Sequence, residues 1–175
     1  MSQKIESSLE AGETAVGIFI DIEGAFDGTP QEVLNQAVSD RGVEETLTKW
    51  IKELLRSRHL TGRLAGAKRR IKLGAGCLQG GVLSPLLWCL VVDELIRRLN
   101  KLGFYTQGYA NDIVVLIMGR FLDVLSGQLA EVIRVILEWC AENGLRLNPL
   151  KVALVPFTKK RLSCELLRQP TDLNV

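Results

Sequence analysis

Two aspartates of this 175-residue sequence lie where a short apolar run meets a polar turn, and both could hold a metal ion. Asp21 lies near the end of AVGIFIDI (15–22), a β-branched run typical of a buried central strand. Asp112 lies inside GYANDIVVLIMG (108–119), where two strand-like runs flank an Asn-Asp pair. A carboxylate among apolar residues is costly unless it is paired or binds a cation. Carboxylates suit hard divalent cations, and two such ions can clamp the attacking and leaving oxygens of a phosphoryl transfer.

A simpler interpretation of the same residues stays open on spacing alone. Each aspartate could merely cap the end of a strand. Asn111 would then suit the turn of a β-hairpin, because asparagine tolerates a positive φ. Residues 108–119 are therefore an ordinary hairpin tip, a metal site, or a metal site that has lost one ligand.

The elements that would position these acids are predicted from the periodicity of apolar residues. Thr29 is expected to cap a helix, with Glu32 completing a capping box. No element is predicted for the polar N-terminus, MSQKIESSLE. Helical spacing predicts helices at about 30–40, 43–55, 84–100 and 122–140, and strand patterns fall at 15–22, 104–109, 112–118 and 145–158.

The order of these elements predicts an α+β fold. It contains a split β-α-β-β-α-β path, which forms an antiparallel sheet with helices packed on one face. In that topology the first strand lies beside the 104–118 hairpin, so Asp21 and Asp112 can meet at one edge of the sheet. Residues 1–160 are expected to form the domain, and residues 161–175, which lack a clear period, a loosely ordered tail.

Charge is distributed unevenly along the chain. Residues 1–53 carry eleven acids against four Lys and Arg, whereas residues 56–72 carry seven Lys and Arg and no acid. The segment 56–74 is predicted to be a basic hairpin punctuated by glycines. Its cations could contact phosphates, or they could guard an exposed strand edge against aggregation, and charge alone does not separate these interpretations.

Composition narrows the class of protein. Hydrophobic content of 47% with 24% charged residues is typical of a soluble globular domain. The longest apolar stretch, 82–92, is too short to span a bilayer, and the N-terminus has no apolar signal core. We therefore expect a cytoplasmic or nuclear protein, not secreted and without membrane contact. Four cysteines without a CxxC pair, and one histidine, leave little for a zinc site.

Four segments together resemble the palm motifs of reverse transcriptases, most closely those of non-LTR (LINE-type) retrotransposons of the jockey-like kind. They occur in the family's order and cover most of residues 16–160. They read FIDIEGAFD (19–27), GCLQGGVLSPLLW (76–88), GYANDIVVL (108–116) and GLRLNPLKVALVPFTKK (144–160). The resemblance implies a palm-type sheet and RNA-directed DNA polymerase activity. It also implies two Mg²⁺ ions, and as partners an RNA template, a DNA primer and a deoxynucleoside triphosphate.

The resemblance also implies roles for single residues around the metal ions. Asp21 and Asp112 would bind metal, together with the backbone carbonyl of Ile22, and Asn111 stands where the family has a further catalytic aspartate. Lys151 matches a lysine near the departing pyrophosphate. Phe26 matches the bulky residue that crowds a 2′-hydroxyl and so selects deoxyribose, although a core aromatic would be equally compatible.

Further roles concern substrate and template. Gln79 and Gly80 resemble the loop that packs against the incoming nucleotide and template, and Tyr109 belongs to the substrate-contacting hairpin. With the family in view, the basic segment is interpreted as a contact to nucleic acid through Lys68, Arg69 and Arg70.

The sequence departs from the family where catalysis depends on charge. Asn111 replaces the first of two adjacent aspartates, and an amide bridges two cations poorly. Leu78 stands where the family has proline, and most of the fingers and all of the thumb are expected to be absent. A partial, impaired polymerase domain is therefore expected.

The alternatives are a non-catalytic nucleic-acid-binding remnant and a translated relic without selected function. A nucleotide cyclase is weaker, because the Gln-Gly loop and the Tyr-Ala-x-Asp hairpin argue against it. The pattern does not indicate an oligomeric state.

Overall fold

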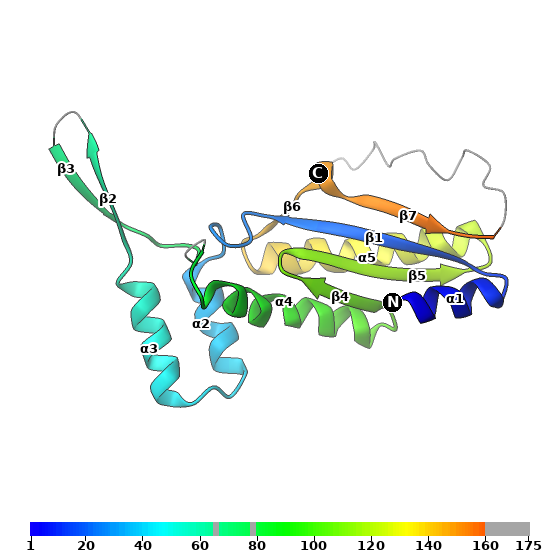
Figure 1. The fold of residues 1–175 in the computed structure, drawn as a ribbon, viewed down its shortest axis with the longest axis horizontal. Helices are drawn as coiled ribbons and strands as arrows, with labels where there is room; N and C mark the ends of the chain where they lie inside the picture. The colour runs from blue at the N-terminus through cyan, green and yellow to red at the C-terminus, as the bar shows by residue number, and fades with distance from the viewer. Residues whose placement is uncertain (65–66, 78–79, 160–175) are drawn as a thin grey trace.

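A computed structural model describes residues 1–64, 67–77 and 80–159 of the chain (Figure 1). The expected tail 161–175 and the loop residues Leu78 and Gln79 lie outside the described residues. The helices are α1 (Ser2–Glu10), α2 (Gln31–Asp40), α3 (Glu45–Arg56), α4 (Ser84–Lys101), α5 (Leu122–Glu142) and the 3₁₀ turn η1 (Pro149–Lys151). The strands are β1 (Thr14–Glu23), β2 (His59–Leu64), β3 (Ala67–Lys72), β4 (Tyr105–Tyr109), β5 (Asp112–Gly119), β6 (Arg146–Leu147) and β7 (Ala153–Phe157).

Strand β1 is the centre of an antiparallel sheet. It pairs with β5 along almost its whole length, from Thr14 opposite Gly119 to Asp21 opposite Asp112. On its other side it pairs first with β7 and then, at its C-terminal end, with β6. Strand β4 forms a hairpin with β5 and completes the sheet. The predicted α+β fold with a palm-type split β-α-β-β-α-β sheet is confirmed.

The apolar alternation of the strands builds the core on one face of the sheet. Ile18, Ile20 and Ile22 of β1 are at most 2% exposed and point to the side covered by α4 and α5 (Figure 1). Trp88 of α4 and Trp139 of α5, both fully buried, complete the same core. Burying one large side chain stabilises the fold by about 1.5–3 kcal/mol, so this layer holds the strands in register.

Helix α1 was not predicted from the sequence, and it covers part of the opposite face. Ala15 and Leu116 point away from the main core, yet they are at most 1% exposed. The amino terminus of the chain donates a hydrogen bond to Tyr105 Oη (3.2 Å), and Lys4 Nζ lies 5.2 Å from the centre of the Tyr105 ring. Helix α1 is mostly polar and only nine residues long, so it would be marginal on its own, and packing on the sheet holds it in place.

One local prediction about a helix cap was wrong. Thr29 does not cap α2, because its hydroxyl donates to the Ala25 carbonyl (2.5 Å) inside the turn that follows β1. Asn111 does not take the positive φ of the β4–β5 turn. Ala110 takes it, with φ of 52°, and is the only residue other than glycine to do so in the described ranges. Asn111 is the other residue of this two-residue turn, and its φ is not positive.

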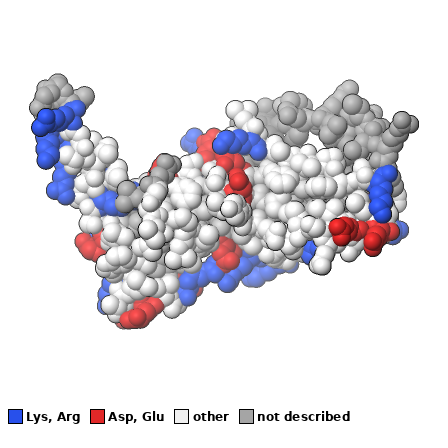
Figure 2. Space-filling view, in the orientation of Figure 1, with Lys and Arg blue, Asp and Glu red and all other residues white. Residues whose placement is uncertain are grey.

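The basic hairpin is confirmed as a two-stranded sheet, β2–β3, that projects from the end of α3 (Figure 1). It is a separate sheet and is not hydrogen-bonded to the five-stranded sheet. Lys and Arg side chains gather along it, at the upper left of Figure 2.

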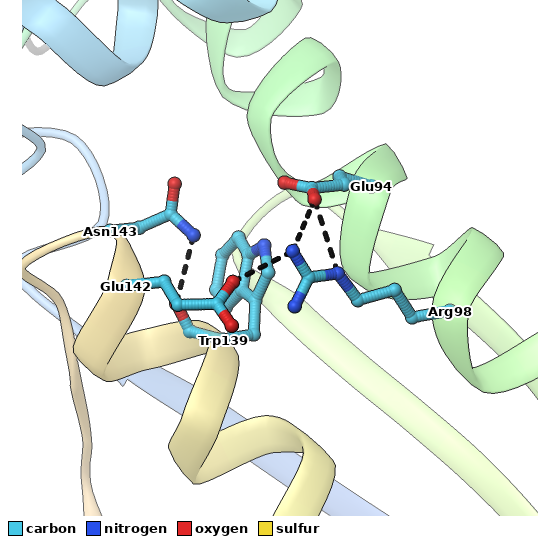
Figure 3. A network of polar contacts seen from close by, with 5 residues as sticks. All are labelled: Glu94, Arg98, Trp139, Glu142 and Asn143. Atoms are coloured by element: carbon cyan, nitrogen blue, oxygen red, sulfur yellow. Dashed lines mark hydrogen bonds and ion pairs between the residues drawn. The ribbon is translucent and has the colours of Figure 1, made fainter.

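An ion-pair network braces α4 against α5 behind the sheet (Figure 3). Arg98 Nη2 lies 2.5 Å from Glu94 Oε1 within α4 and 2.7 Å from Glu142 Oε2 at the end of α5. Hydrogen bonding to Arg98 lowers the pKa of the Glu142 carboxyl and raises that of the guanidinium. The side-chain amide of Asn143 donates to the Trp139 carbonyl (2.8 Å) and closes the last turn of α5. The helices of the described ranges include none long and apolar enough to cross a membrane.

Candidate active site

An open cleft of about 900 Å³ lies over the ends of β1, β4 and β5 and is bordered by Ile96 of α4. Asp21, Asn111 and Asp112 lie in its wall, and Tyr109, which is 84% exposed, stands at its rim. The remaining lining residues are Phe19, Ile20, Ile96, Thr106, Gln107, Gly108, Ile113, Val114 and Lys151. Thus Asp21, Asn111, Asp112, Tyr109 and Lys151, all singled out from the sequence, share one cleft.

The two aspartates face each other across neighbouring strands. Asp21 of β1 is the register partner of Asp112 of β5, so both side chains project from the same face of the sheet. Like charges directly opposite each other destabilise a sheet unless a cation offsets them. Lys151 supplies that cation, because its Nζ lies 3.1 Å from Asp21 Oδ2.

The segment after α5 positions Lys151. Strand β6 pairs with the end of β1, and the Asn148 amide nitrogen then donates to the Asp21 carbonyl (3.0 Å). The Asn148 side chain accepts from the amide nitrogen of Leu150 (3.2 Å) and opens the 3₁₀ turn. Pro149 fits the start of this turn because its φ is already helical. The turn ends at Lys151 and so delivers an ammonium group to Asp21.

Both oxygens of Asp21 accept hydrogen bonds from neighbouring nitrogens. Asn111 Nδ2 donates to Oδ1 at 3.0 Å, and Asn148 Nδ2 lies 3.4 Å from Oδ2. With Lys151, three side chains therefore surround a carboxylate that is only 13% exposed. Asn111 turns its amide NH₂ group toward Asp21. This NH₂ group, with its partial positive charge, would repel a cation bound at Asp21.

The donor set decides which metal centre the residues could form. Asp21 and Asp112 provide two carboxylates on one face, which fits one hard divalent cation in the place that the Lys151 ammonium takes. It does not fit a pair of ions bridged by three carboxylates. Over the ranges that the structure describes, no group of three or more His, Cys, Asp or Glu could hold a metal.

The loop after β1 is fixed against the glycine-rich segment that precedes α4. The amide nitrogens of Gly76 and Cys77 donate to the carbonyls of Thr29 and Phe26, each at 2.6 Å. A Cβ at Gly76 would lie 2.5 Å from the Asp27 carbonyl oxygen, so this contact requires glycine. Phe26 is half-buried, and its ring centre lies 6.3 Å from that of Trp88.

The other predicted contact residues that the structure describes lie outside the cleft wall. Phe26 packs toward the core, and the backbone of Ile22 pairs with Leu147 of β6. Gly80 has a φ of 79° with open space around it, whereas Gln79 lies outside the described residues. Lys68, Arg69 and Arg70 lie on β3 of the projecting hairpin, away from the cleft lining.

Comparison with known proteins gives the family. A family model described as "Reverse transcriptase (RNA-dependent DNA polymerase)" matches residues 2–167. The chain belongs to the reverse transcriptase family. Two relatives come from mobile elements of Drosophila melanogaster. A putative 115 kDa protein in the type-1 retrotransposable element R1DM is 27% identical over 83% of this chain. The RNA-directed DNA polymerase from mobile element jockey is 28% identical over 90% of it. The predicted kinship with non-LTR retrotransposon reverse transcriptases is thereby confirmed.

This reverse transcriptase chain spans 14% and 18% of the lengths of those two relatives. Among solved structures it is similar to telomerase of Candida tropicalis. An apo form, truncated from the C-terminal domain, has a TM-score of 0.66 at 14% identity, over 92% of this chain and 35% of that one. A complex with a fragment of telomeric RNA has a TM-score of 0.67 at 12% identity, over 89% and 28%. At these identities the likeness shows the fold alone.

Sequence reasoning about this reverse transcriptase missed Asn148. It lies inside the LNPLK portion of the fourth motif, but no role was predicted for it. The signal that could have found it is the Asn-Pro pair, since asparagine before proline favours the start of a turn. In the structure Asn148 both opens that turn and reaches Asp21.

Proposed function

We propose that this chain is the palm part of an RNA-directed DNA polymerase of a non-LTR retrotransposon, and that Asn111 impairs its catalytic step. The observation that supports the proposal is the register pairing of Asp21 with Asp112 in the cleft, with Asn111 hydrogen-bonded to Asp21. The proposed reaction is attack of a primer 3′-hydroxyl on a deoxynucleoside triphosphate, directed by an RNA template.

In this proposal, different residues of the cleft have different roles. Asp21 and Asp112 would hold one divalent ion, Mg²⁺ being the expected one, and that ion would polarise phosphate oxygens as a Lewis acid. Lys151, which lines the cleft and is 64% exposed in its side chain, would offset negative charge on the departing pyrophosphate. Tyr109, at the rim, offers an exposed ring against which a base can stack.

Asn111 reduces what this site can do, for two reasons. It brings no negative charge, so a second divalent ion lacks a bridging ligand. Its amide also donates to Asp21 and competes with a cation for that carboxylate. Loss of one charge-stabilising group costs roughly a hundredfold to a thousandfold in rate, about 2.7–4 kcal/mol. We infer an impairment at least that large.

Primer extension on an RNA template tests the proposal. The unmodified chain is compared with Asn111→Asp, and Asp21→Asn in the Asn111→Asp background serves as the inactive control. Extension by Asn111→Asp at roughly a hundredfold or more the rate of the unmodified chain is the expected result. Equal rates for the two would refute the impairment. No extension by either, with template binding intact, would refute polymerase activity for this chain alone.

A second candidate function rests on a different observation. The hairpin β2–β3 is basic, and in the described part of the chain its cations have no acidic partner within ion-pair distance. A non-catalytic nucleic-acid-binding domain would keep this hairpin after losing a catalytic aspartate. Binding of RNA without extension by either variant is the outcome that favours it.

A further inference from the structure

The hairpin β2–β3 has two chemically different faces. Opposed residues of antiparallel strands point to the same side, and successive residues alternate. The pairs His59–Lys72, Thr61–Arg70 and Arg63–Lys68 therefore share one face. The other face holds Leu60 opposite Ile71 and Gly62 opposite Arg69. Leu60 and Ile71 are 58% and 60% exposed.

This alternation concentrates charge. Four of the five cations on the two strands, Arg63, Lys68, Arg70 and Lys72, fall on the first face, which we term the basic strip. The fifth, Arg69, falls on the apolar face. A contact across the strands agrees with this assignment, because Arg70 Nη2 lies 3.2 Å from His59 Nδ1 on the diagonal of the same face.

Cations that merely guard a strand edge do not need to share a face. A guard blocks pairing by its charge and bulk at the edge of the strand, on whichever side it points. The basic strip instead places Lys68, Arg70 and Lys72 at every second residue, so their spacing is about 7 Å and their span about 14 Å. None of the three has an acidic partner within ion-pair distance among the described residues. A row of unpaired cations at this spacing can follow a row of backbone phosphates.

We propose that the basic strip of β2–β3 is a docking site for the phosphate backbone of nucleic acid, separate from the cleft, and that Arg69 takes no part in it. The proposal rests on the nucleic-acid-binding function proposed above and narrows it to one face of one hairpin. Phosphate contacts of this kind hold a strand without reading its bases. The strip therefore binds single-stranded RNA and duplex DNA with little sequence preference.

Neighbouring arginines provide a matched pair of variants for the test. Arg70→Gln and Arg69→Gln remove the same charge from the same residue type at adjacent positions of one exposed strand. Binding of the intact chain to a fluorescently labelled single-stranded RNA is measured over a range of salt concentrations, and again with a duplex DNA. Thermal unfolding of each variant checks that the fold is retained.

The quantity to compare between variants is the slope of log affinity against log salt concentration. This slope is negative, and each lost phosphate contact reduces its magnitude by about 0.7 on single strands and about 0.9 on duplex DNA. Arg70→Gln should lower it by about that amount, Arg69→Gln should leave it unchanged, and the triple variant Lys68→Gln/Arg70→Gln/Lys72→Gln should lower it by about 2 or more. Equal slopes for Arg69→Gln and Arg70→Gln would refute the one-faced strip while leaving the proposed function in place. A chain that binds neither nucleic acid would refute both.

Discussion

Replacing Asn111 by aspartate should destabilise the metal-free protein and make its stability depend on divalent cations. The change removes the hydrogen bond from Asn111 Nδ2 to Asp21 Oδ1, 3.0 Å long, from a carboxylate that is 13% exposed. A hydrogen bond to a charged group contributes about 1.5–3 kcal/mol. The change also adds a negative charge beside Asp21 and near Asp112.

The size of the repulsion depends on the surroundings. Two unit charges about 4 Å apart repel by about 4 kcal/mol at an effective dielectric constant near 20. Because Asn111 is only half-buried, the new aspartate side chain can turn toward water. The hydrogen-bond term therefore lies at the lower end of its range, and the repulsion is smaller than the value at 4 Å. We expect a loss of about 3 kcal/mol in total, which for a domain of this length lowers the melting temperature by about 6–12 °C.

Thermal unfolding with EDTA and then with Mg²⁺ or Mn²⁺ is the assay. An ion that binds only the folded state stabilises it by about 2.7 kcal/mol at a hundred times its dissociation constant, so it should restore most of the loss in Asn111→Asp. The unmodified chain should respond less, because Asn111 brings no carboxylate and its amide competes with the ion for Asp21. Asn111→Ala is the control that loses the hydrogen bond without gaining charge, and it should respond to the ion less than Asn111→Asp, because only Asp21 and Asp112 remain to bind it. If Asn111→Asp proves as stable as the unmodified chain in EDTA, the reasoning fails.

Two further predictions concern the fold. Gly76→Ala should destabilise by about 3 kcal/mol or more, because its Cβ would lie 2.5 Å from the Asp27 carbonyl oxygen at a φ of 76°. Gly12→Ala, at a φ of 73° with nothing within 4 Å, should cost only about 1–2 kcal/mol in urea unfolding, and equal costs would contradict the close contact. Burial raises the pKa of the Cys140 thiol to about 11. The stabilisation from this thiol is therefore complete below its ordinary pKa of about 9 and is lost as pH rises toward 11, by about 2–3 kcal/mol. Cys140→Ala should flatten that part of the stability profile, and an unchanged profile would exclude the thiol as its cause.

The periodic elements of this protein could be predicted from sequence because their own side chains determine them. The long helix expected at 122–140 extends to 142, and the strand expected at 112–118 extends to 119. The meeting of Asp21 with Asp112 followed from topology, since a split β-α-β-β-α-β path places the first strand beside the central hairpin. In each case local pattern and global fold agree.

What could not be predicted depends on contacts between distant residues. Helix α1 is short and mostly polar, and it owes its position to packing against Tyr105 and β1. The Thr29 hydroxyl had a local alternative to capping, the Ala25 carbonyl, which only the folded turn brings within reach. The ion pair of Lys151 with Asp21 requires both the β1–β6 pairing and the 3₁₀ turn, neither of which has a strong sequence signal.

The central position of β1 has a consequence for how the chain is made. Its partners are synthesised long after it, as the contacts of Asp21 with Asn111 and of Thr14 with Thr158 show, which span 90 and 144 residues. During translation, β1 therefore leaves the ribosome as an apolar strand without neighbours and must wait for β5 and β7. Long-range pairing of this kind slows folding and leaves an aggregation-prone strand exposed meanwhile. A nascent chain stopped before β5 would be a good chaperone substrate, whereas one released after β7 could close the sheet on both sides of β1.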